Sequence, residues 1–225
     1  GNDERFADAR KLDASGNHMN YGGNYTYDKL YVPTLDNAFG RETARCIDAI
    51  LDDIGADGIL GEFCTSRGEY IYNMWDGCTA DIDPDTLEIQ RLKGSVALLS
   101  AGWRKQQVER IQQRGFLLCS GAPYTRTVAE TKYIAFCETG SITYCRGMLL
   151  WTPVGLGDHL TERTQADAYR QMLRQLDHGC LYSWYTTQII PTHPTLTEHM
   201  FPFTPIELHE GVLIGEERII TNRSG

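Results

Sequence analysis

The chain has 225 residues, of which 41% are hydrophobic and 10% aromatic, so it is long enough to bury a sizeable core in one domain. Its net charge of −9 argues against a nucleic-acid partner, because no basic cluster offsets the acidic side chains. No segment approaches the roughly 18 apolar residues of a membrane span, so no membrane is expected as a partner.

Seven cysteines are scattered along the chain without a C-x-x-C pair, which predicts free, mostly buried thiols rather than a disulfide framework or a zinc site. We expect no metal and no cofactor. The polar N-terminal residues lack the apolar core of an export signal. The compartment stays open, since secretion or the periplasm is compatible with a longer protein.

Three segments have helical character, taken in chain order. In residues 41–55, isoleucine and leucine recur at helical spacing and Gly55 stands where a C-terminal cap is needed. Residues 83–115 open with Asp83-Pro84, a cap and a first-turn proline. They predict either one helix or two helices separated by a break near Gly102. In residues 164–179, Thr164 and Asp167 are spaced for a capping box and Gly179 follows the predicted end.

Between these helices lie short apolar runs that are typical of strands covered on both faces. They are the segments 57–63 (DGILGEF), 115–121 (GFLLCSG), 132–139 (KYIAFCET), 147–153 (GMLLWTP) and 179–185 (GCLYSWY). The alternation of strand, loop and helix predicts an α/β fold with mostly parallel strands, a partial (β/α)8 TIM-barrel-like architecture. Residues 1–200 would form the C-terminal half of a barrel. Residues 201–225, with the β-prone runs GVLI and RIIT, would lead out towards a β-rich domain.

Carboxylates stand at the ends of two of these runs. Glu62 follows GILG and Glu138 follows IAFC. Functional groups of parallel α/β folds gather at the C-terminal ends of strands, and paired carboxylates there predict general acid–base chemistry on a glycosidic bond. The alternative for each glutamate is a solvated first loop residue or a helix-capping partner.

Aromatic and polar residues accompany the two acids. Aromatic rings stack on sugar C–H surfaces and leave a polar tip for hydroxyl groups, whereas the alternative is that they pack a loop onto the protein. The predicted substrate-binding residues are Tyr72, Trp75, Tyr124, Arg126, Trp151, Asp158, His159 and Trp184. This aromatic and acidic set suits an uncharged carbohydrate better than a nucleotide.

Residues 30–63, LYVPTLDNAFGRETARCIDAILDDIGADGILGEF, resemble a segment of many TIM-barrel glycoside hydrolases in which a helix leads through GADGI to a strand ending in an acid. Residues 203–225 resemble the passage from such a barrel into an appended β-domain. The resemblance is loosely α-galactosidase-like and implies paired acids on the fourth and sixth strands, here Glu62 and Glu138. That group uses aspartates, and its members often carry an aromatic residue and an aspartate where this chain has Leu60 and Gly61.

The leading hypothesis is therefore a glycoside hydrolase, with Glu62 and Glu138 as catalytic residues and polysaccharide degradation as its role. The alternative is a non-catalytic carbohydrate-binding or scaffolding barrel. A barrel enzyme with a Schiff-base lysine is disfavoured, because Lys132 alone lies near a strand, at its start. An open half-barrel would also need a missing half or a second copy to cover its edge.

Overall fold

The structure, a computed structural model, describes residues 4–21, 28–61, 69–120, 134–137, 154–156, 163–183 and 196–222. The chain divides into two compact units. Unit 1 comprises Gly1–Ile59, Cys64–Leu117 and Tyr124–Tyr133, and unit 2 comprises Leu60–Phe63, Leu118–Pro123 and Ile134–Gly225.

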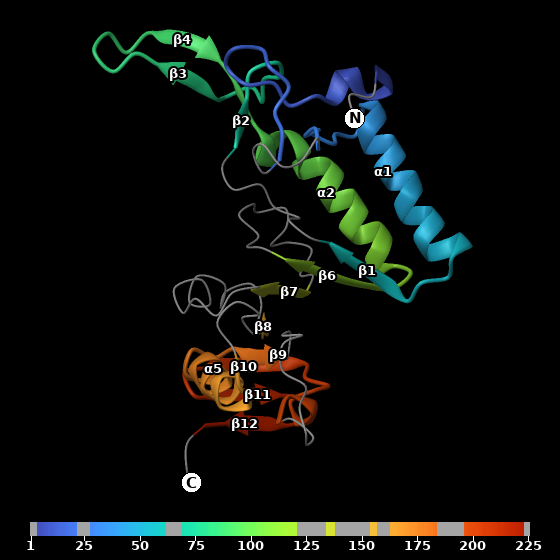
Figure 1. The fold of residues 1–225 in the computed structure, drawn as a ribbon, viewed down its shortest axis with the longest axis vertical. Helices are drawn as coiled ribbons and strands as arrows, with labels where there is room; N and C mark the ends of the chain where they lie inside the picture. The colour runs from blue at the N-terminus through green and yellow to red at the C-terminus, as the bar shows by residue number, and fades with distance from the viewer. Residues whose placement is uncertain are drawn as a thin grey trace. The chain divides into compact units, whose positions relative to one another are not determined.

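In its described residues, unit 1 combines two α-helices with two small antiparallel sheets (Figure 1). Its elements are a 3-10 helix Glu4–Ala9, α1 (Ala38–Asp48), a π-helical turn Ala49–Asp53, β2 (Tyr70–Ile71), β3 (Ala80–Ile82), β4 (Ile89–Leu92), β5 (Gly94–Ser95) and α2 (Val96–Gln112). Strand β2 pairs with β5, and β3 pairs with β4. Val32, Ile71 and Val96 form the buried core where β2 meets the start of α2.

Helix α1 confirms the helix predicted from residues 41–55. It begins after Asn37, whose side chain accepts a hydrogen bond from the Gly40 N–H at 2.8 Å. Its last turn continues in π geometry to Asp53. Gly55 then adopts φ +74°, a left-handed conformation that glycine tolerates at the end of a helix.

The prediction of helix throughout residues 83–115 is wrong in its first part. The side chain of Asp83 accepts hydrogen bonds from the N–H groups of Asp85 and Thr86, both at 2.9 Å, so it closes the turn between β3 and β4 instead of capping a helix. Helix α2 begins only at Val96, and it runs without a break through Gly102.

A five-stranded sheet has the order β1-β6-β7-β8-β9; unit 2 contains all of β7, β8 and β9 and the C-terminal residues of β1 and β6. The strands are β1 (Gly58–Gly61), β6 (Phe116–Ser120), β7 (Ile134–Cys137), β8 (Val154–Leu156) and β9 (Leu181–Ser183). The pairs β6–β7, β7–β8 and β8–β9 are parallel. Strands β1 and β6 have residues in both units.

The predicted partial (β/α)8 barrel with mostly parallel strands is wrong. Among the described residues, three of the four sheets are antiparallel, and no pairing joins the edge strands β1 and β9 into a closed ring. Barrel closure requires a matched stagger and tilt across all strands. Short apolar runs specify single strands but not that long-range pairing, so the fold is a mixed α/β arrangement of small sheets.

The C-terminal residues of unit 2 add a three-stranded antiparallel sheet. It consists of β10 (Pro205–His209), β11 (Val212–Gly215) and β12 (Ile219–Thr221), and it follows a 3-10 helix at Leu196–His199. The Gly211 N–H donates to the Leu176 carbonyl at 2.9 Å, which ties this sheet to the end of helix α5 (Gln165–Asp177).

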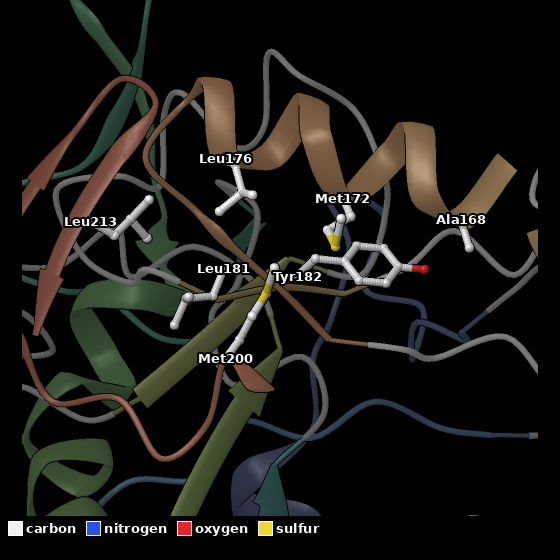
Figure 2. Close-up of a cluster of buried hydrophobic side chains, with 7 residues drawn as sticks. All are labelled: Ala168, Met172, Leu176, Leu181, Tyr182, Met200 and Leu213. Atoms are coloured by element: carbon white, nitrogen blue, oxygen red, sulfur yellow. The ribbon is translucent and has the colours of Figure 1, made fainter. Parts of the chain in front are cut away.

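One core joins α5 to both sheets of unit 2. Figure 2 shows the side chains of α5 pointing towards those of β9. The buried cluster consists of Ala168, Met172, Leu176, Leu181, Tyr182, Met200 and Leu213. The adjacent residues Leu181 and Tyr182 of β9 are both buried, as predicted for this run. By contrast, Leu60 of β1 is 63% exposed and Phe116 of β6 is 73% exposed, so the prediction of two-sided burial fails for those strands.

Helix α5 begins with the predicted capping box. The Thr164 hydroxyl oxygen accepts from the Asp167 N–H at 3.2 Å, and the Asp167 carboxylate accepts from the Thr164 N–H at 2.9 Å. The hydrogen bond from the Thr164 side chain is the main cause that lowers the pKa of Asp167, to about 2.

We expect Thr164→Ala to lower the free energy of unfolding by about 1 kcal/mol, because the N-terminal turn of α5 loses its cap. Thermal and urea unfolding of the full chain measure the change. Thr164→Ser keeps the hydroxyl and is the matched control. Equal stability of the alanine and serine variants would contradict the assigned role of the cap.

Candidate functional site

The two candidate catalytic acids follow strands that are neighbours of the same strand. Strand β1 ends at Gly61 and β7 ends at Cys137, and β6 lies between them in the sheet. Glu62 and Glu138, the residues that come next in the sequence, lie outside the described residues.

The directions of these strands can be derived from their hydrogen bonds. The N–H of Phe116, the first residue of β6, donates to the carbonyl of Asp57, directly before β1, at 2.9 Å. The first residues of the two paired strands therefore lie beside each other, so β1 and β6 run in the same direction. Strand β7 is parallel to β6, with Leu118 opposite Ile134. The C-terminal ends of β1, β6 and β7 therefore lie at the same edge of the sheet.

Most of the predicted substrate-binding residues lie outside the described residues as well. These are Tyr124, Arg126, Trp151, Asp158, His159 and Trp184. Tyr72 and Trp75 are described, and both belong to unit 1, after strand β2.

The ring of Tyr72 is covered on one face by a cation. The guanidinium of Arg91 lies 4.2 Å from the centre of this ring, and the Lys93 ammonium lies 4.4 Å from the centre of the neighbouring Tyr70 ring. Asp81 holds both cations, with 3.2 Å to Arg91 and 2.5 Å to Lys93. Only the opposite face of Tyr72 could therefore stack on a sugar.

The cluster of Asp81, Arg91 and Lys93 was missed at the sequence level. The hydrogen bond from Lys93 is the largest cause that lowers the pKa of Asp81, so this carboxylate is ionised at neutral pH. Asp81 pairs with Arg91 across the β3–β4 hairpin. The turn residues Asp83-Pro84-Asp85 between two β-prone runs were the signal that could have predicted this hairpin.

Trp75 presents an exposed ring on a fixed turn. Its side chain is 53% exposed, and its indole N–H donates to the Thr79 carbonyl at 3.2 Å. The Asp76 carboxylate accepts from the N–H groups of Cys78 and Thr79 at 2.9 and 2.8 Å, from the Thr79 hydroxyl at 2.6 Å and from the Ser95 N–H at 2.7 Å. These bonds fix the turn to β5, so Trp75 is the described aromatic residue that best fits a sugar platform.

The same hydrogen bonds dominate the electrostatics of Asp76. Burial acts to raise the pKa of this carboxyl group, but the Thr79 side chain and the N–H groups of Ser95, Cys78 and Thr79 outweigh it and bring the pKa well below the ordinary value of 3.8. At neutral pH, Asp76 is therefore a charged anchor of the turn rather than a proton donor.

The described residues contain no group of histidine, cysteine and carboxylate side chains arranged to hold a metal ion. Across the same residues, none of the helices has the length and apolar character to cross a membrane.

Comparison with models of protein families, with curated proteins and with solved structures gives no match for this chain.

Proposed function

We propose that this protein hydrolyses glycosidic bonds of a neutral carbohydrate, with Glu62 and Glu138 as its pair of catalytic carboxylates. The observation that carries the proposal is the sheet order: β1 and β7, which directly precede the two acids, flank β6 and end at the same edge.

This strand spacing suits a two-carboxylate mechanism. Neighbouring strands lie about 4.8 Å apart, so two residues on strands separated by one other are roughly 9–10 Å apart at the backbone. Inverting glycosidases have carboxyl groups about 6.5–9.5 Å apart, and retaining enzymes about 5–5.5 Å. The spacing favours the wider arrangement, in which a water molecule fits between the base and the sugar.

In the inverting reaction, one glutamic acid donates its proton to the glycosidic oxygen as the bond to the anomeric carbon breaks. The other, as a carboxylate, takes a proton from the water that attacks that carbon from the opposite face. Which of Glu62 and Glu138 is the acid depends on which is nearer the leaving group.

A second function, carbohydrate binding without cleavage, is favoured by one separate observation. The exposed ring of Trp75 on its rigid turn can stack on a sugar without help from either acid. Binding of this kind would not depend on a carboxylate pair.

The proposal is tested by incubating the full chain with a panel of aryl glycosides and soluble neutral polysaccharides. We expect new reducing ends, and ¹H NMR of the first product should show an anomeric configuration opposite to that of the substrate. A preparation of the double variant Glu62→Gln/Glu138→Gln controls for contaminating glycosidases.

A reducing-end yield equal to that of the double variant on every substrate would contradict hydrolysis. If the same preparation bound a polysaccharide and Trp75→Ala abolished that binding, carbohydrate binding would replace hydrolysis as the function.

A further inference from the structure

A groove on unit 1 shares no residue with the predicted catalytic and sugar-binding residues. It has a volume of about 260 Å³ and lies between α1 and α2, which run side by side in Figure 1. The two helices are joined there by a hydrogen bond from the Trp103 indole N–H to the Gly40 carbonyl at 2.9 Å. The groove is therefore part of a packed helix pair.

The groove is positively charged in a chain whose net charge is −9. Three arginines, Arg41, Arg45 and Arg110, line it with a single carboxylate, Asp48. Asp48 is shared, since one of its oxygens accepts from Arg110 and the other from Arg114, both at 2.6 Å. Arg114 is also held by Asp52 at 2.6 Å, so Asp48 and Asp52 together balance Arg110 and Arg114.

The arginines differ in how they are engaged. Arg45 is held by both oxygens of Glu42, at 2.9 and 2.8 Å, so its charge is already balanced. Arg41 donates to the backbone carbonyl of Asp36 at 2.5 Å and has no carboxylate partner among the described residues. Arg41 and Arg110 therefore retain donors for an anion, because a guanidinium group carries five N–H bonds.

The remaining wall of the groove is apolar. The indole of Trp103 lines it together with Leu35, which is 49% exposed. An arginine guanidinium beside an aromatic face matches a ligand that has a carboxylate or phosphate group at one end and a ring or short apolar group at the other.

We propose that this groove binds a small organic anion, whose carboxylate or phosphate oxygens accept hydrogen bonds from Arg41 and Arg110 and whose apolar part contacts Trp103 and Leu35. The volume lies below the range of about 300–1,000 Å³ typical of drug-sized ligands, so the ligand is small. Bidentate guanidinium–oxyanion pairs supply the affinity and fix the orientation.

The test is a titration of the full chain, followed by NMR at the Trp103 indole signal and by calorimetry, with three probes: phenyl phosphate, benzoate and inorganic phosphate. We expect saturable binding of at least one ring-bearing probe, at least about fivefold tighter than binding of inorganic phosphate. The stronger of phenyl phosphate and benzoate identifies the head group.

Arg41→Gln should weaken binding by about tenfold or more. It removes a bond to a backbone carbonyl and no ion pair, so the fold should persist, and circular dichroism checks this. Arg110→Gln is the second variant. Arg174→Gln, at an exposed position of α5, removes the same charge from unit 2 and should leave binding unchanged.

The proposal is overturned if no probe gives a saturable response at the Trp103 signal, or if Arg41→Gln and Arg174→Gln have equal effects. Equal affinity for inorganic phosphate and both ring-bearing probes would exclude the apolar contact. Glu62→Gln should bind the probes normally, so failure of this proposal and failure of the proposed hydrolysis are separable.

Discussion

Glu62→Gln and Glu138→Gln are each expected to lower turnover of a natural polysaccharide by about a thousandfold or more. General acid or base catalysis alone contributes roughly 10²–10⁴ in rate, and glutamine can neither donate nor accept the proton. Steady-state kinetics on the same substrate, with KM and kcat separated, measure the loss. It should lie in kcat, since the amide keeps the size of the side chain.

Aryl glycosides separate the two roles. A nitrophenolate leaves without protonation, so the variant that lacks the acid should retain far more activity on an aryl glycoside than on a polysaccharide, whereas the variant that lacks the base should lose both. Glu88→Gln, an exposed position next to β4, is the matched control and should keep full activity. Near-normal kcat in either Glu62→Gln or Glu138→Gln would remove that residue from the mechanism.

Asp76→Ala is expected to lower the free energy of unfolding by about 2–4 kcal/mol at neutral pH. The change removes the acceptor of four hydrogen bonds and leaves the N–H groups of Thr79 and Ser95 without their partner. Hydrogen bonds to a charged group are worth about 1.5–3 kcal/mol, and partners left unsatisfied add to the cost. Urea unfolding measures the change.

The lowered pKa of Asp76 also predicts how the stability difference between the native chain and Asp76→Ala changes with pH. The folded-state pKa of Asp76 lies below the ordinary value of 3.8, so the folded state binds this proton less readily than the unfolded state does. The stabilisation is complete above that ordinary value and is lost as the pH falls through the lower folded-state pKa. The stability gap between the native chain and Asp76→Ala should therefore narrow below about pH 4, and a gap that widens there would contradict the assignment.

Asp76→Asn is the isosteric control. It keeps one acceptor oxygen and the shape of the side chain, so the free energy of unfolding of Asp76→Asn should lie between that of the native chain and that of Asp76→Ala. Because the Asp76 bonds also fix the turn that carries Trp75, both substitutions should alter the fluorescence of that indole.

The structure confirms the predictions that depend only on residues close together in the sequence. The capping box of Thr164 and Asp167 and the glycine at position 55 specify the ends of their helices, and the structure confirms them. The runs around Leu118, Leu181 and Leu213 form strands, because a short apolar run between turn signals needs little more than its own residues.

The predictions were wrong where the structure depends on the pairing of strands that are distant in the sequence. The sequence Asp83-Pro84 is as common at the start of a helix as in a turn. In this chain it forms the turn of the β3–β4 hairpin, in which Asp81 pairs with Arg91. A barrel depends on the stagger of every strand with the next, which no local run contains. The apolar side chains of Leu60 and Phe116 are exposed for a related reason: an apolar segment of sequence does not determine which other elements pack against it.

The candidate site is predictable to the same limited extent. Apolar runs that end in acids predict Glu62 and Glu138 as the catalytic pair. Both residues lie outside the described residues, so this stays a prediction, and what the structure adds is that the strands before them share an edge of one sheet. The contact between Tyr72 and Arg91 was not predictable, because Tyr72 follows β2 whereas Arg91 lies on β4, in a segment that the sequence predicts as a helix.

The most direct measurement is the separation of the two carboxyl groups in an experimental structure of the chain with a bound sugar. We predict that the nearest oxygens of Glu62 and Glu138 lie roughly 6.5–9.5 Å apart, on either side of the anomeric carbon. A separation well above about 10 Å, or carboxyl groups at opposite edges of the sheet, would contradict a shared catalytic role.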